Sequence, residues 1–244
     1  MNTAKNIFNN DIKKNSGYYY NCQKILSNFI AGKIETDQIV FFVKNLQSKN
    51  IIDLGCGDGI YTKILLKNCN SIKKILAIDI AEEAIKIAKK NNNSNKLEYI
   101  SSNIDYFLKN KKKIQKFDTV ILRSSLHHFT KKDFLKFFKI IKNFNFNLVI
   151  SEPNGYNLIL KLIEKISKYH VDHDEQSYTP YFLRMNLKKS GYEVIESCYT
   201  SLTPVFFPDV LVDLSYKLNK IIKKIPIINS FFCGKYILVA KKKS

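Results

Sequence analysis

Short apolar runs and amphipathic stretches alternate along most of the chain. The apolar runs predict buried strands at residues 50–54, 74–79, 97–101, 117–122 and 147–151, and later at 192–199 and 236–240. Between the first five runs, apolar positions recur every three or four residues and predict helices at 61–67, 81–90 and 131–142. This order predicts an α/β fold, in which a Rossmann-like, mostly parallel sheet carries helices on both faces.

The segments outside this alternation predict additions to the core. Residues 1–17 are polar and expected to be mobile. A first helix is expected to open at Tyr18, and a second to start near Thr36 and Asp37, where either residue can cap it. Residues 1–48 are therefore expected to form a helical lid on a domain that spans 49–244. A helical insertion is expected at about 202–234, before the last strand.

A glycine-rich turn follows the first strand. Residues 53–59 read Asp-Leu-Gly-Cys-Gly-Asp-Gly, between an apolar run and a helix. A strand, a glycine turn and a helix in this order place backbone N–H groups beside a cleft at the strand's carboxyl end. Ile60 stands where a dinucleotide fingerprint needs its third glycine, and no Gly-Lys-Ser/Thr follows as in a Walker loop. Asp79 ends the second strand, where an acid can bind ribose hydroxyls.

These residues resemble the class I S-adenosylmethionine-dependent methyltransferases. The turn matches their glycine motif, Asp79 their ribose-binding acid, and residues 117–129 their fourth-strand segment. The resemblance implies a seven-stranded sheet in the order 3-2-1-4-5-7-6 with strand seven antiparallel, S-adenosylmethionine (SAM) as cofactor, and S-adenosylhomocysteine as product. It also implies cofactor-binding roles for Asp53, Gly55, Cys56, Gly57, Gly59, Asp79, Ile80, Asn103, Ile104, Arg123 and Ser124. Asn103 stands where many relatives carry Asp, but its carbonyl oxygen can still accept from the adenine amino group.

Methyl transfer from a sulfonium needs in-line placement of the acceptor and, for a hydroxyl acceptor, a base. Candidate bases are His128, His127 and Glu152, which follow the fourth and fifth strands, and His173 within residues 170–175. The histidines and acids of 170–175 also suggest a metal site, but we expect no metal because the reaction needs none. A small organic acceptor, methylated on oxygen, is the expected substrate.

The net charge of the chain suggests alternative partners and acceptors. The chain has 40 Lys and Arg against 21 Asp and Glu, a formal charge of +19, which favours anionic partners. Only Arg123 and Arg184 are arginines, whereas nucleic-acid readers favour arginine forks, so we expect no nucleic-acid partner; RNA methylation stays an alternative. Lysines interleave with apolar residues at 206–225. That pattern suggests either contact with an anionic membrane, with a lipid or quinone acceptor, or a helix that covers the cleft or a dimer face; we favour the second.

The cysteines and the N-terminal residues bear on the compartment of the protein. The five cysteines form no CxxC pair, and the N-terminus has no apolar run typical of a signal peptide. We therefore expect a cytoplasmic protein. A non-catalytic cofactor-binding domain is the remaining alternative, and the sequence does not indicate an oligomeric state.

Overall fold

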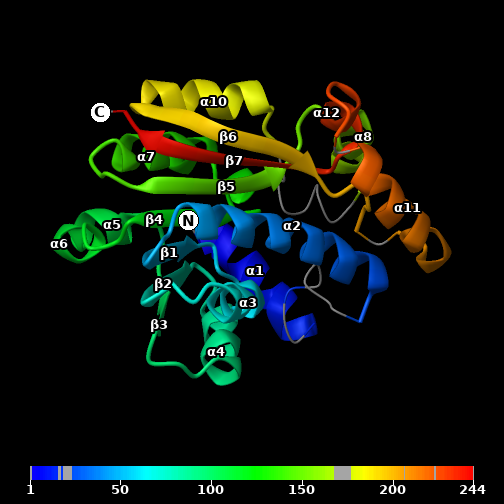
Figure 1. Cartoon of the computed structure of the whole chain (residues 1–244). Helices are drawn as coiled ribbons and strands as arrows, with labels where there is room; N and C mark the ends of the chain where they lie inside the picture. The colour runs from blue at the N-terminus through cyan, green and yellow to red at the C-terminus, as the bar shows by residue number, and fades with distance from the viewer. Residues whose placement is uncertain are drawn as a thin grey trace.

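The computed structural model describes residues 2–15, 18, 24–167, 177–205, 207–222 and 224–243 (Figure 1). Up to the fourth strand its elements are α1 (Asn2–Asn15), α2 (Leu26–Asn45), β1 (Asn50–Leu54), α3 (Ile60–Asn68), β2 (Lys74–Asp79), α4 (Glu82–Asn91), β3 (Leu97–Ser101), α5 (Asp105–Lys109), α6 (Lys111–Ile114) and β4 (Thr119–Arg123). They are followed by a 3₁₀ turn (Leu126–His128), α7 (Lys131–Ile141), β5 (Asn147–Pro153), α8 (Leu158–Ile166), α10 (Pro180–Lys189), β6 (Tyr192–Thr200), α11 (Asp209–Ile222), α12 (Ile228–Phe232) and β7 (Lys235–Lys242).

The strands form one seven-stranded sheet in the order β3-β2-β1-β4-β5-β7-β6. Strands β1 to β5 pair in parallel, and β7 pairs antiparallel with both β5 and β6. The predicted fold and strand order are confirmed. The carboxyl ends of β1, β2, β4 and β5 therefore meet at one edge of the sheet, together with the start of β7.

Apolar residues alternate between the two faces of the sheet, as a sheet covered on both sides requires. In β4, Val120 and Leu122 pack on the side covered by α7 and α10, and Ile121 packs on the side covered by α2, α3 and α4 (Figure 1). Phe134 and Phe137 of α7 are buried in the first of these layers. The amphipathic pattern of α7 therefore predicts its orientation correctly.

The N-terminal helices differ from the prediction. Residues 2–15 form the helix α1, in which Phe8 and Ile12 are buried, so the expected mobile polar segment is wrong there. Residues 26–45, which the prediction divided between two helices, form one continuous helix, α2, and the predicted helical stretch from Tyr18 falls largely on residues 19–23, outside the described part of the chain. Thr36 lies in its middle, and its hydroxyl donates to the Gly32 carbonyl at 2.6 Å instead of capping an end. This i to i−4 bond satisfies the hydroxyl within the helix, which is why a capping residue type did not mark a helix start.

α2 is a layer of the main core. Its residues Ile39, Phe42 and Val43 pack in the same cluster as Ile51 of β1 and Val149 of β5. α2 therefore shares a core with the sheet, while the helical lid expected of residues 1–48 stays a prediction.

The insertion before β7 contains α11 and α12, and a further helix, α8, follows β5 without having been predicted. The helices of the described residues do not combine the length and the apolar character that a bilayer crossing requires.

Candidate active site

The glycine turn links β1 to α3. Gly55, Gly57 and Gly59 all have positive φ angles, of 84°, 57° and 76°. A Cβ atom at Gly55 would also lie 2.5 Å from the Cβ atom of Ser125, so glycine is required there by conformation and by space. The N–H groups of Gly55 and Cys56 donate to the Ile78 carbonyl at 2.8 and 3.2 Å. The turn is thereby held against the carboxyl end of β2.

Asp79 holds the same turn from the end of β2. One of its carboxylate oxygens accepts from the Gly57 N–H and the other from the Ala81 N–H, both at 2.9 Å. Burial raises the pKa of Asp79 to about 6, against the opposing effect of these two N–H donors. Each carboxylate oxygen has a further lone pair, so Asp79 can support the turn and still accept from ribose hydroxyls.

Two more buried carboxyl groups lie at this turn. The Thr62 hydroxyl donates to Asp53 at 2.6 Å, and Asp58 is also buried. Burial raises the pKa of Asp53, and it raises the pKa of the Cys56 thiol well above its ordinary value, with nearby Asp79, Asp53 and Asp58 adding to the effect. The glycine turn therefore lies among three carboxyl groups, and the side chain of Cys56 stays a neutral thiol.

The N-terminal residues cover this region. Phe8 of α1 packs edge-on against His128, with ring centroids 5.0 Å apart, and Tyr18 lies against Gly57. At the start of α4, the Glu83 N–H donates to the Asn9 side chain at 3.2 Å. Ile80, next to Asp79, is partly buried against the same α1 cluster.

At the end of β3, Asn103 binds its own loop. Its side-chain oxygen accepts from the Asp105 N–H at 2.9 Å, at the start of α5, and Ile104 is buried in the core. The amide oxygen expected to face the adenine is thus engaged in a local Asx-type turn.

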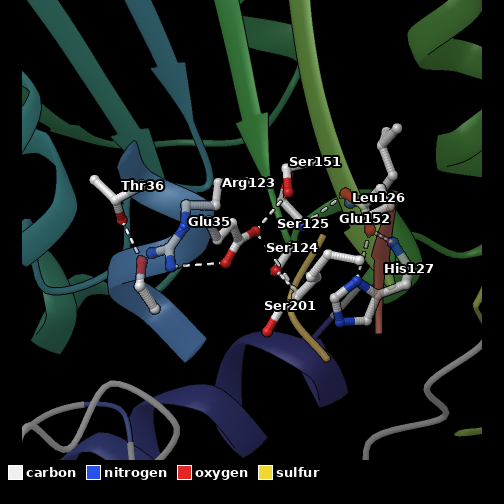
Figure 2. Close-up of polar contacts among 12 residues, drawn as sticks. Glu35, Thr36, Arg123, Ser124, Ser125, Leu126, His127, Ser151, Glu152 and Ser201 are labelled. Carbon is white, nitrogen blue, oxygen red and sulfur yellow. Dashed lines mark hydrogen bonds and ion pairs between the residues drawn. The ribbon is translucent and has the colours of Figure 1, made fainter. Parts of the chain in front are cut away.

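A buried charged cluster joins α2 to the ends of β4, β5 and β7 (Figure 2). Arg123 donates to Glu35 at 2.8 Å, and the Ser151 hydroxyl donates to the other oxygen of Glu35 at 2.5 Å. Lys235 lies 3.8 Å from Glu35 and donates to the Ser124 hydroxyl. Burial by itself would raise the pKa of Glu35, but Arg123 and Lys235 hold it below its ordinary value.

Glu35 pairs with both cations of this cluster, and the same cations act on neighbouring carboxyl groups: Lys235 opposes the rise in the pKa of Glu152, and Arg123 opposes the rise in the pKa of Asp53. Ser124 adopts a positive φ of 49°, which is uncommon for a residue other than glycine and is found at functional sites. The guanidinium of Arg123 also lies over the ring of Tyr61, in the first turn of α3. Arg123 therefore connects the glycine-turn side of the sheet edge to the β5 and β7 side.

Glu152, at the end of β5, is fully buried and anchors the loop after β4. Its carboxylate accepts from the N–H groups of Ser125 at 2.9 Å, Leu126 at 2.8 Å and His127 at 3.3 Å (Figure 2). A fourth bond, at 2.7 Å, joins it to the His127 Nδ1 atom. Burial raises the pKa of Glu152 to about 7, although the N–H donors oppose the shift. Glu152 thus fixes the 3₁₀ turn and the orientation of the His127 ring.

Known proteins match this fold and these motifs. The family described as "Methyltransferase domain" matches residues 45–202, which include the glycine turn, Asp79, the 3₁₀ turn and Glu152. The chain belongs to this methyltransferase family. Methyltransferase activity and the use of SAM, expected from the resemblance, are confirmed.

Solved structures share the fold across most of the chain. The methyltransferase domain of bacterial CtHen1 is 18% identical, with a TM-score of 0.62 over 88% of this chain and 100% of that chain. Magnesium protoporphyrin IX methyltransferase of Synechocystis PCC 6803, with bound SAH, is 17% identical, with a TM-score of 0.59 over 86% of this chain and 82% of that chain. An uncharacterized RNA methyltransferase of Clostridium tetani is 36% identical over 84 residues, which are 33% of this chain and 17% of that protein.

These similar proteins differ in the acceptors that their names state. Small-RNA and porphyrin methyltransferases share the fold, and the Clostridium tetani protein is named an RNA methyltransferase. The expectation that nucleic acid is not a partner is therefore not supported, and the class of acceptor is open.

The residues of the methyltransferase site fit SAM. The sulfonium and ammonium groups of SAM are cations, and the glycine turn presents the buried carboxyl groups of Asp53, Asp58 and Asp79. The N–H groups of Gly55, Cys56, Gly57 and Gly59 are bonded within the protein, so these carboxyl groups are what the turn offers to a ligand.

The structure brings most of the predicted residues to one sheet edge and gives some of them further roles. Glu152 binds backbone groups and His127, and Arg123 binds Glu35. His173 lies outside the described residues, as does the whole 170–175 segment, so the expectations for that segment stay predictions. Glu35 and Lys235 were missed, because nothing local in the sequence marks an acid within a helix or a lysine at a strand start as part of a site.

Proposed function

We propose that this methyltransferase methylates an oxygen of a small organic acceptor, with His127 as the base and Glu152 as its positioning residue. The observation that carries the proposal is the 2.7 Å contact between His127 Nδ1 and the fully buried Glu152. A base whose ring is fixed by a carboxylate is a recurring arrangement in acid–base catalysis.

In this proposal the two nitrogens of His127 have different tasks. With Nδ1 as the donor to the Glu152 carboxylate, Nε2 would take the acceptor's hydroxyl proton. The deprotonated acceptor oxygen would then be the nucleophile, and the sulfur of SAM would be the leaving group and keep the electron pair of the broken carbon–sulfur bond. Bound SAM supplies an electrophilic methyl group on a sulfonium. Glu152 stabilises the imidazolium that forms, because its carboxylate lies beside Nδ1.

The charged cluster supports an acidic acceptor. Arg123 and Lys235 both pair with Glu35, close to the loop that carries His127. An acceptor with a carboxylate or phosphate group could bind these two cations, since opposite charges near a buried site attract strongly.

The test begins with labelled SAM and a metabolite extract, to identify an acceptor. His127→Gln is then expected to lower kcat about 100-fold or more while leaving SAM affinity within about threefold. Glu152→Gln, which keeps the shape of the carboxylate, is expected to lower kcat and shift its pH profile. Unchanged turnover in His127→Gln would contradict the assignment of the base.

RNA methylation is a second candidate, favoured by the identity to the RNA methyltransferase of Clostridium tetani and by the charge of +19. Label transferred to small RNA or tRNA, and not to any extract metabolite, would replace the first proposal by this one.

We also propose that residues 1–48 act as a cofactor lid through their first helix. Phe8 packs on His128, Tyr18 on Gly57, and Lys5 pairs with Glu82 at 2.5 Å. Phe8→Ala should therefore speed SAM release, as measured by stopped-flow fluorescence or surface plasmon resonance. An unchanged release rate would limit α1 to a structural role.

A further inference from the structure

The helix α8 packs with its polar side toward the protein. Lys161 donates to the Ser177 carbonyl at 2.7 Å, and the Ser177 N–H donates to Glu164 at 3.1 Å. Its apolar residues point outward: Leu158 is 73% exposed and Ile166 is 71% exposed. Helices that pack on a core normally show the opposite orientation.

The helix α11 is oriented in the same way. The residues that it buries are Val212, Ser215 and Asn219. Ser215 shares a hydrogen bond of 2.8 Å with Thr203, and Asn219 accepts from the Leu202 N–H at 2.9 Å. The larger apolar side chains are exposed, namely Val210, Leu211, Leu214, Leu218 and Ile221. The expectation that this apolar face covers the cleft is therefore wrong for the described residues.

Buried asparagines hold α12 beside α8. Asn154 donates to the carbonyls of Ser230 at 2.7 Å and Cys233 at 2.9 Å, and Asn157 donates to the Phe232 carbonyl at 3.1 Å. These bonds fix the helix through its backbone and leave its side chains Phe231 and Phe232 about half exposed. Polar anchoring thus keeps the apolar side chains out of the core.

The three helices lie together at one end of the molecule (Figure 1). We call their outward surface the apolar end; it consists of Leu158, Ile159, Leu162, Ile166, Val210, Leu211, Leu214, Leu218, Ile221, Ile225, Ile227, Ile228, Phe231 and Phe232. Scattered exposed apolar residues are normal, but this many exposed apolar side chains at one end of the molecule mark an interaction surface.

Charge and composition indicate what covers the apolar end. Exposed lysines border it, including Lys165, Lys220 and Lys224. A second copy of the chain would bring another formal charge of +19 against this one, which opposes self-association. RNA would favour stacking aromatic residues, whereas most of these side chains are aliphatic. Aliphatic faces bordered by lysines fit the interface of an anionic bilayer.

We propose that the apolar end docks on the surface of an anionic phospholipid membrane. The proposal is independent of the acceptor and of the base. The apolar end is close in sequence to two residues of the site, because α8 begins six residues after Glu152 and α12 ends three residues before Lys235.

The test is flotation of the full chain with vesicles of phosphatidylcholine alone or with about a third of phosphatidylglycerol. We expect binding to the anionic vesicles only, weakened by added salt. Leu162→Gln with Ile166→Gln on α8, and separately Leu214→Gln with Ile221→Gln on α11, should each lower partitioning about tenfold or more. The matched control is Leu135→Gln, because Leu135 is a 54% exposed residue of α7 and lies outside the apolar end.

Lysine variants test the electrostatic part. Lys220→Gln with Lys224→Gln should lower anionic partitioning about fivefold per lysine, whereas Lys89→Gln with Lys90→Gln on α4 should leave it unchanged. SAM affinity by calorimetry should be the same in all variants and reports that each is folded.

Four outcomes would overturn the proposal. The first is no binding of the unmodified chain to anionic vesicles, and the second is an equal loss in the Leu135 control. The third is a dimer in sedimentation analysis that the α8 and α11 variants dissociate, which would assign the surface to a second copy. The fourth is loss of RNA binding in these variants with vesicle binding unchanged.

Discussion

The two halves of the sheet edge carry different sets of charged groups. The β1–β2 half presents the buried carboxyl groups of Asp53, Asp58 and Asp79 around the glycine turn. In the β4–β5–β7 half, the cations Arg123 and Lys235 lie among the carboxyl groups of Glu35 and Glu152. The first half suits a cationic cofactor, whereas the second holds both signs of charge in a buried network.

The halves also differ in how they are built. The acidic half comes from residues close together in the sequence, whereas Glu35 contacts residues 88 and 116 positions away. Variants in each half should therefore have separable effects: on cofactor affinity in the acidic half, and on stability and acceptor use in the other.

The largest effect is expected for Glu35→Gln. It leaves Arg123 and Lys235 without their carboxylate, and loss of one partner from a buried ion pair costs about 3–5 kcal/mol. Urea unfolding measures the loss. Glu82→Gln, which removes an exposed partner of Lys5, is the control and should leave the unfolding midpoint unchanged. Equal unfolding midpoints for the two variants would show that the buried Glu35 carboxylate contributes no more to stability than an exposed one.

Gly55→Ala comes next. Its Cβ would meet Ser125 at 2.5 Å, and its φ is 84°. We expect SAM affinity to fall about 100-fold, corresponding to about 2.7 kcal/mol, measured by calorimetry. Gly191→Ala is matched in φ, at 77°, but meets only the Lys242 side chain at 3.4 Å. Gly191→Ala should lower the free energy of unfolding by about 1 kcal/mol and leave SAM affinity unchanged. The two variants together separate the effect of crowding from that of backbone strain.

Asp79→Asn should weaken SAM binding about 10- to 100-fold, because charge-assisted hydrogen bonds contribute about 1.5–3 kcal/mol. Asp118 is a matched control, since it also accepts from two backbone N–H groups, those of Lys49 and Asn50, at the other edge of the sheet. Asp118→Asn should lower stability without changing SAM affinity. Similar affinity losses in the two variants would argue against a ribose contact.

The smallest effect concerns pH. The pKa of Asp79 is raised to about 6, so the carboxyl group protonates as pH falls through that value. If SAM requires the ionised form, its dissociation constant should rise about fivefold between pH 6 and pH 5. The free protein should respond in the opposite sense, because a raised pKa means that the folded state binds more protons, and this group's contribution to stability improves as pH falls from 6 toward 4. In Asp79→Asn the pH dependence of affinity should flatten.

The sequence predicts the parts of this molecule that are local. Strand order and the glycine turn follow from patterns within a few residues of one another, and so does the inward face of α7. The sequence predicted a helix start near Thr36, but the Thr36 hydroxyl bonds within α2. The role of Glu35, the residue before Thr36, was therefore missed. Lys235 and Ser151 meet Glu35 only through the order of the strands. The outward face of α11 was only one of the alternatives offered, because a hydrophobic stripe does not say on which side it lies, and α8 was not predicted.

The bonds of Glu35 also have a consequence for folding. α2 is made early in synthesis, yet Lys235 emerges almost 200 residues later, after every other strand. Arg123 and Ser151 can pair with Glu35 once β4 and β5 have been made, but Lys235 joins the cluster only with the last strand. Such long-range closure raises contact order and slows folding. We therefore expect the charged cluster around Glu35 to be completed last as the nascent chain folds.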